Sequence, residues 1–132
     1  MTRKILLTGK NGQVGWELER TLSTLGQVVA LSQADMDLAD PDSISKVIRA
    51  IKPDLIVNPA AYTAVDKAEA EPELALAING VAPGIMAEEA KRLGATLIHF
   101  STDYVFDGAS TTAYVEQDAP NPKSVYGSSK LE

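Results

Sequence analysis

Two groups of residues in this 132-residue chain have types and spacings that suit chemistry. The first is a glycine-rich loop, TGKNGQVG, at residues 8–15. The second is the pair Tyr126 and Lys130, four residues apart and therefore on one face of a helix. An ammonium group beside a phenol stabilises the phenolate, which makes the phenol a usable proton donor. We therefore predict a phosphate-binding loop and a proton-transfer pair.

The glycine loop lies between an apolar run at 4–8 and a helical pattern that begins near Gly12. Glycine allows the sharp turn and the close approach of a pyrophosphate, and the helix start offers free N–H groups to the phosphates. This context favours a dinucleotide site over a turn without a ligand. The loop residues predicted to contact the dinucleotide are Gly9, Lys10, Gly12, Gln13, Val14 and Gly15.

The end of the second predicted strand bears on the choice of dinucleotide. An acid there would hold the ribose 2′-hydroxyl and repel a 2′-phosphate. The sequence at 30–33 is ALSQ, without an acid, and Lys10 stands in the nearby loop. We therefore expect NADPH to be the cofactor, with NADH tolerated and Ser32 at the site. The alternative for Lys10 is an ordinary solvated lysine.

A third chemical group follows the fourth predicted strand, where parallel sheets place their ligands. Thr102 there has a hydroxyl that could hydrogen-bond a reacting oxygen, and it completes a catalytic set with Tyr126 and Lys130. His99, within the strand, is more readily explained by packing than as a base, and we expect no metal site.

Strand and helix patterns alternate along the whole chain. Apolar runs at 4–8, 27–31, 54–57 and 95–100 predict four strands. We predict an α/β fold, a doubly wound Rossmann-type parallel sheet with strand order 3-2-1-4, truncated after the fourth strand and the start of the next helix.

Helix signals fill the connections. Asp40-Pro41 is a good start for a helix whose apolar face includes Ile44 and Ile48. A longer helical region at 72–93 contains Pro83-Gly84, which predicts a kink or break. A last helix should begin near Ser124.

Composition sets the broad class. The length fits one domain, 1–132. Eighteen acidic against twelve basic residues give a net charge of -6, which argues against nucleic acid or an anionic membrane as partner. There is no cysteine, and no apolar stretch approaches the ~20 residues of a membrane span. We expect a soluble, cytoplasmic protein.

Four long motifs resemble one family closely. They lie at 9–18, 57–69, 101–108 and 125–131, and they are similar to the N-terminal portion of the dTDP-4-dehydrorhamnose reductases in the extended short-chain dehydrogenase/reductase superfamily. The spacing of Gly9, Gly12 and Gly15 is also that of the superfamily.

The resemblance implies reduction of the C4 keto group of dTDP-4-dehydro-6-deoxy-L-mannose to dTDP-L-rhamnose, with hydride from NADPH. Tyr126 would protonate the alkoxide, Lys130 would tune Tyr126 and bind the nicotinamide ribose, and Thr102 would orient the carbonyl. Further contacts implied are Asp37 and Leu38 along the adenine, Ala61, Tyr62 and Thr63 beside the cofactor, and Thr102 and Asp103 on the sugar.

Two alternatives stay open. The missing C-terminal substrate region predicts weak or absent turnover, so a non-catalytic dinucleotide-binding or regulatory module is one of them. A sugar-nucleotide epimerase or dehydratase is the other, although Ser32 in place of an acid counts against it. We also expect a homodimer, since the fourth strand would be an open apolar edge.

Overall fold

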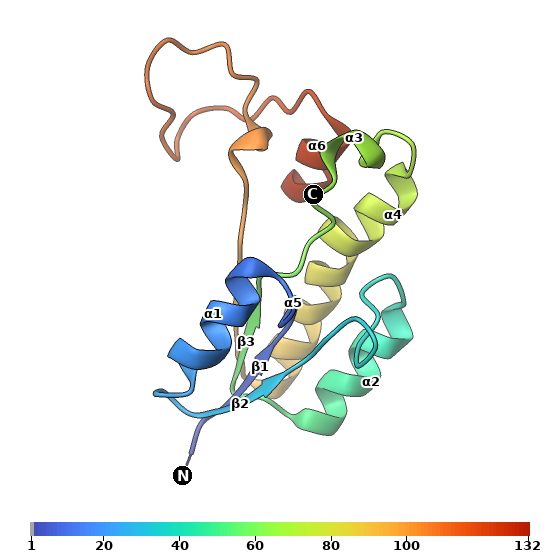
Figure 1. The fold of residues 1–132 in the computed structure, drawn as a ribbon, viewed down its shortest axis with the longest axis vertical. Coiled ribbons are helices and arrows are strands. Elements are labelled where there is room, and N and C mark those ends of the chain that lie inside the picture. The colour runs from blue at the N-terminus through green and yellow to red at the C-terminus, as the bar shows by residue number, and fades with distance from the viewer. Residues whose placement is uncertain (1) are drawn as a thin grey trace.

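The computed structural model describes residues 2–132 and is built around a four-stranded parallel sheet (Figure 1). Its strands are β1 (Lys4–Leu7), β2 (Gln27–Ala30), β3 (Leu55–Asn58) and β4 (Thr96–His99). The predicted α/β class and parallel sheet are confirmed. The predicted order 3-2-1-4 is wrong, because the strands lie in the order β2-β1-β3-β4.

The position of β3 explains the difference. Its residues Ile56 and Val57 are 0% and 3% exposed, so this strand needs neighbours and cover on both faces. It therefore pairs with β1 on one side and β4 on the other, with Ile5 opposite Leu55. The strand β2 takes the edge. Chain connections leave β1 and β3 in opposite directions across the sheet, which makes the gap between their carboxyl ends the expected ligand crevice.

Helices cover both faces of the sheet. They are α1 (Gln13–Leu22), α2 (Pro41–Ile51), α3 (Val65–Ala68), α4 (Pro72–Leu76), a π-helical turn η1 (Ala77–Val81), α5 (Ala82–Leu93), a 3-10 turn η2 (Asp103–Val105) and α6 (Val125–Leu131). One core joins Leu6 and Ile56 to Ile44 and Met86 of α2 and α5. The other joins Ile5, Leu7 and Val57 to α1.

The predicted helix starts are well placed. Asp40 caps α2 by accepting a hydrogen bond from the Asp42 N–H at 3.0 Å, with Pro41 at the first helical position. In the 72–93 region, the predicted interruption takes the form of the π-helical turn η1 just before Pro83. A wider turn there accommodates a proline that has no N–H to give to the preceding turn.

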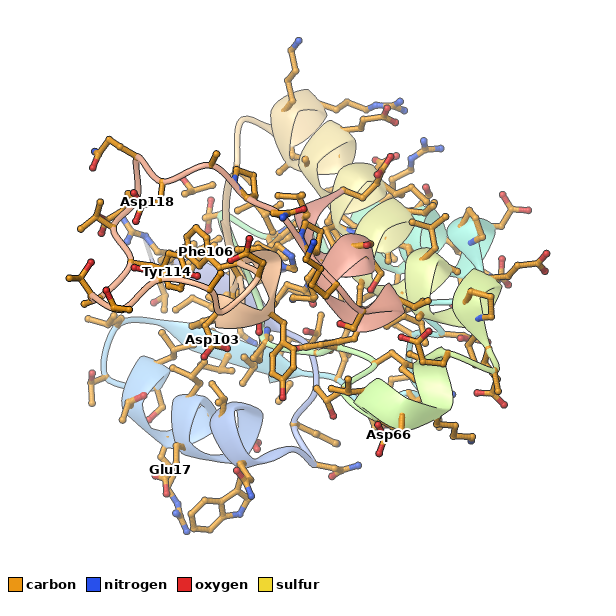
Figure 2. The ribbon with its side chains drawn as sticks, turned by 90° about the horizontal axis from the view of Figure 1, so that it is seen from above. Glu17, Asp66, Asp103, Phe106, Tyr114 and Asp118 are labelled. Carbon is orange, nitrogen blue, oxygen red and sulfur yellow. The ribbon has the colours of Figure 1, made fainter. Side chains whose placement is uncertain are left out.

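The last helix, α6, lies near α3 and α4 beyond the carboxyl ends of the strands (Figure 1). A long loop at 106–124 precedes it, in which Phe106 stacks on Tyr114 with ring centroids 4.3 Å apart (Figure 2). Ser124 then caps α6 by accepting from the Gly127 N–H. No helix within residues 2–132 combines the length and apolar character that a membrane crossing requires.

Candidate functional site

The glycine loop makes a tight turn between β1 and α1. Gly9 has φ +63°, a left-handed conformation that favours glycine, and its carbonyl accepts a hydrogen bond from the Gly12 N–H at 2.9 Å. A Cβ on Gly15 would collide with the carbonyl oxygen of Gly9. Glycine at position 15 is therefore what lets α1 begin directly against the loop.

The start of α1 is left open to a ligand. Its N-cap, Gly12, has no side chain to bond the first N–H groups, and its first turn carries no acid. In α2, Asp40 and Asp42 supply both features. The uncapped end of α1 faces a hollow of about 650 Å³ lined by the loop and by the segment after β3. Free N–H groups and a positive helix dipole at a hollow suit a pyrophosphate.

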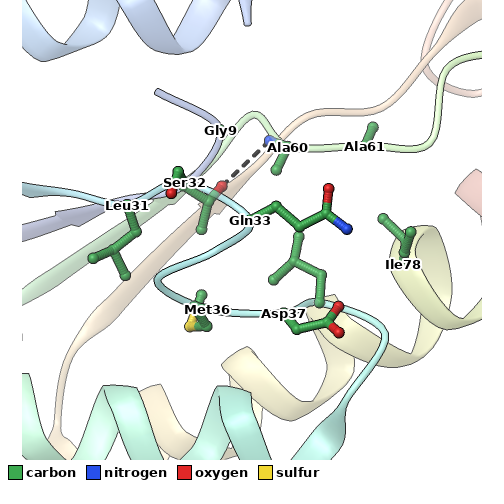
Figure 3. Close-up of a pocket in the computed structure, with 11 residues that line it drawn as sticks. Gly9, Leu31, Ser32, Gln33, Met36, Asp37, Ala60, Ala61 and Ile78 are labelled. Atoms are coloured by element: carbon green, nitrogen blue, oxygen red, sulfur yellow. Dashed lines mark hydrogen bonds between the residues drawn. The ribbon is translucent and has the colours of Figure 1, made fainter. Parts of the chain in front are cut away.

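A second hollow, of about 150 Å³, lies at the end of β2 (Figure 3). Leu31, Met36 and Ile78 give it apolar walls, and Ser32 and Asp37 give it polar groups. The two hollows share Gly9, Ala60 and Ala61, so they form one groove along the carboxyl ends of β1 and β3. The predicted cofactor residues that line the groove are Gly9, Gly12, Gln13, Val14, Gly15, Ser32, Asp37, Leu38, Ala61 and Thr63.

Lys10 and Tyr62 lie outside the walls of both hollows. The backbone N–H of Lys10 donates to Leu31 at the end of β2, which places Lys10 at the rim. The ring of Tyr62 packs in a cluster with Ala68, Ala75 and Tyr126. Its hydroxyl donates to Glu71, and this bond raises the pKa of Tyr62 to about 12. Of these two predicted cofactor residues, Tyr62 therefore has its side chain turned away from the groove.

Tyr126 and Lys130 are both buried on α6, each 9% exposed. Burial lowers the pKa of Lys130. The ring of Tyr104 meets Tyr126 edge to face, with centroids 5.5 Å apart. The helix itself is held at its start by Glu69, whose carboxylate accepts from the Val125 N–H at 2.9 Å. The two residues of the predicted acid/base pair therefore lie on the same helix, and a hydrogen bond to Glu69 fixes the start of that helix.

Thr102 and Asp103 lie at the segment that packs against α6 through Tyr104. The Thr102 hydroxyl accepts from the Tyr104 N–H at 3.2 Å and caps η2, while Asp103 is exposed. Among the hydrogen bonds of residues 2–132, none joins Thr102 to Tyr126 or Lys130. Thr102 therefore caps η2 through its oxygen, while its O–H remains a donor that lies 3.4 Å from Asp103 Oδ1.

Sequence reasoning did not place Asn79, which is 2% exposed in η1. Its Oδ1 accepts from the Tyr62 N–H at 2.8 Å, and its Nδ2 donates to the Tyr62 carbonyl and to Ser129 Oγ, both at 3.0 Å. The only signal in the sequence is a polar residue next to the apolar stripe of Ile78 and Val81.

A chain of polar contacts also crosses the sheet at the groove, from the buried Thr8 and Asn58 to the exposed His99. Thr8 Oγ1 donates to Asn58 Oδ1 at 2.6 Å, and Asn58 Nδ2 lies 3.2 Å from His99 Nδ1. Burial and the nearby charge of Lys130 lower the pKa of His99. His99 thus bonds to Asn58 of the neighbouring strand through Nδ1, but it is exposed on the edge strand β4 and is less packed than predicted.

The parallel sheet, the open helix start and the groove define an α/β protein of the Rossmann type. The chain belongs to the family described as RmlD substrate binding domain, whose model matches residues 3–132. It is 51% identical over 128 residues to the dTDP-4-dehydrorhamnose reductase of Burkholderia thailandensis, covering 97% of this chain and 43% of that protein. It is 48% identical to the Escherichia coli K12 reductase, covering 96% and 44%.

A solved structure agrees with this assignment. The dTDP-4-dehydrorhamnose reductase of Bacillus anthracis, in complex with NADP, superimposes with a TM-score of 0.93 at 35% identity over 99% of this chain and 47% of that chain. The chain therefore spans less than half the length of these relatives.

Proposed function

We propose that this chain supplies the dinucleotide site and the acid/base pair of an NADPH-dependent reductase. The reaction would reduce the C4 keto group of dTDP-4-dehydro-6-deoxy-L-mannose to give dTDP-L-rhamnose. The observation that carries the proposal is the groove at the open start of α1, which is present in the same chain as a buried Tyr126 and Lys130. The reductase names of its relatives supply the substrate.

The groove residues fit a dinucleotide from end to end. The first-turn N–H groups of α1 would bind the pyrophosphate, and Asp37 and Leu38 would lie along the adenine. Ser32 and Lys10 stand at the end of β2, where the ribose 2′-position is read. A bound NADPH would supply the hydride, and NADH would be tolerated.

The chemistry of the chain itself is proton delivery. Tyr126 would hold a proton at its phenol oxygen for the alkoxide that forms at C4, and Lys130 would stabilise the phenolate left behind. Lys130 would also bind the nicotinamide ribose. Thr102 would orient the carbonyl by donating its O–H and, with Asp103, contact the sugar. The O–H now lies 3.4 Å from Asp103 Oδ1, and the Thr102 oxygen can keep its capping bond from Tyr104 while the O–H turns to substrate.

A second candidate is a non-catalytic dinucleotide-binding module. It is favoured by the finding that, within residues 2–132, no hydrogen bond joins Thr102 to Tyr126 or Lys130. The test is NADPH oxidation in the presence of the keto sugar, measured at high protein concentration for this chain and for Tyr126→Phe. Oxidation that disappears in the phenylalanine variant supports the reductase. No oxidation in either protein, with dinucleotide binding retained, supports the module.

The proposed partners are the dTDP-sugar and a second copy of this chain. The strand β4 is an edge of the sheet, and its residue Ile98 is 45% exposed. Phe100, just beyond the strand, is 40% exposed. An open strand edge with apolar side chains favours pairing with another chain.

A further inference from the structure

An acid that the strand-end sequence does not reveal lies at the ribose end of the groove. Asp35 follows β2 by five residues, but the turn at 32–36 brings it back to Ser32. Its Oδ2 accepts from the Ser32 N–H at 2.8 Å and from the Ser32 hydroxyl at 2.9 Å. The same oxygen lies 3.9 Å from the Lys10 ammonium. One carboxylate thus takes up both donors of Ser32 and partly neutralises Lys10.

Those three donors are the ones a 2′-phosphate would need. Ser32 lines the hollow where the adenine and its ribose would lie (Figure 3). Lys10 stands beside the end of β2, where its N–H donates to the Leu31 carbonyl. A phosphate ester binds through charge-assisted bonds from N–H, hydroxyl and ammonium groups. The Asp35 carboxylate already has these partners, so it acts as an internal anion at the place where the phosphate would bind.

We propose that Asp35 sets the choice of dinucleotide by competing with the 2′-phosphate for Ser32 and Lys10. This inference rests on the proposed dinucleotide site. NADPH binding requires the carboxylate to give up Ser32 or to lie close to a second anion, whereas NADH leaves the arrangement intact. Asp35 therefore lowers the ratio of the NADPH affinity to the NADH affinity, which is a physical reason for the tolerance of NADH.

The charge of Asp35 is maintained at neutral pH. The two hydrogen bonds from Ser32, aided by Lys10, lower the pKa of Asp35 from its usual value. The side chain is 46% exposed, so it can be replaced without opening a cavity in the core.

The test is calorimetric titration of this chain with NADP⁺ and NAD⁺, for the native protein and for Asp35→Asn. The amide keeps an acceptor for Ser32 and removes the charge. We expect the ratio of the NADP⁺ to the NAD⁺ affinity to rise about tenfold. Lys10→Gln, at a partly exposed side chain, should move the ratio in the opposite direction.

Asp118→Asn is the matched control. Asp118 accepts from the Val115 N–H at 2.9 Å in the long loop, so its change removes the same charge from a similar turn away from the groove (Figure 2). Its affinity ratio should stay at the native value. An unchanged ratio in Asp35→Asn, with both dinucleotides still bound, overturns the role of Asp35 alone. Failure of the native chain to bind either dinucleotide overturns the proposed site and this inference together.

Discussion

The Nδ2 of Asn79 donates a hydrogen bond to the Oγ of Ser129 across 3.0 Å, joining the π-helical turn η1 to α6. The same Asn79 side chain bonds both backbone polar groups of Tyr62 in the segment after β3. Ser129 in turn donates to the Tyr126 carbonyl at 2.7 Å. One buried amide therefore fixes the segment after β3, beside the groove, relative to the helix that carries Tyr126 and Lys130.

Replacing Asn79 with alanine should destabilise the chain and weaken dinucleotide binding together. The variant loses one buried and two partly buried hydrogen bonds and leaves the Tyr62 N–H without its partner, at a cost of about 3 kcal/mol in the free energy of unfolding. Chemical denaturation measures this. Asn121→Ala, which removes one exposed bond to Asp107, is the control and should cost less than about 1 kcal/mol. Equal losses in the two variants would contradict the bracing role of Asn79.

Two glycine-to-alanine changes should differ in outcome: one should weaken dinucleotide binding and the other should stabilise the fold. Gly15→Ala drives a methyl group into the Gly9 carbonyl, so the loop must shift, and dinucleotide affinity should fall by at least about tenfold. Gly84→Ala in α5 meets nothing within 4 Å and should raise the free energy of unfolding by about 0.5–1 kcal/mol. Thermal unfolding and calorimetry on both variants check this pair. A Gly15→Ala protein that binds normally would show that the loop is not the phosphate site.

Local features of this fold follow from the sequence, but features that depend on distant contacts do not. The cap at Asp40 and the start of α6 at Ser124 are set within a few residues and are placed as predicted. The predicted strand order is wrong because β3 pairs with β1 and not with β2. Which strand β3 pairs with depends on which strands must be buried on both faces of the sheet. Local apolar patterns do not encode that choice.

The site shows the same division. The glycine loop is a local motif, and its turn, its hollow and the open start of α1 agree with the prediction. The orientation of Tyr62 depends on Glu71 and that of Asn79 depends on Ser129, which are partners 9 and 50 residues away. Asp35 does not stand out in the sequence because it lies five residues beyond the end of β2. Only the turn at 32–36 brings its carboxylate back to Ser32.

The buried ammonium of Lys130 should lower the free energy of unfolding of the chain. Its burial lowers its pKa, so in the range below the usual value of 10.5 the unfolded chain binds more protons than the folded one. The native free energy of unfolding should therefore rise as the pH rises through that range. Lys130→Met removes the buried ammonium and should be more stable than the native chain by about 1 kcal/mol at pH 7, an advantage that shrinks towards high pH.

Denaturation of the native chain and Lys130→Met at a series of pH values gives this comparison. Lys46→Met, which makes the same substitution at an exposed position of α2, is the matched control for the change of lysine to methionine. A Lys130→Met protein that is less stable than the native chain at neutral pH would mean that the ammonium stabilises the fold.

The edge of β4 should govern self-association. We expect a dimer by light scattering at micromolar concentration, since Ile98 and Phe100 expose apolar surface at an unpaired strand edge. Ile98→Lys places a charge on that edge and should shift the protein to a monomer. Val115→Lys, an equally exposed apolar position in the long loop, should leave the mass unchanged. A native chain that is monomeric at this concentration would contradict the pairing.

The central claim is that residues 2–132 form a working dinucleotide site at the open start of α1. The most direct measurement is a calorimetric titration of this chain with NADPH and with NADH. We predict micromolar binding of both, with NADPH preferred, and loss of both in Gly15→Ala. Absence of binding to either dinucleotide would contradict the claim.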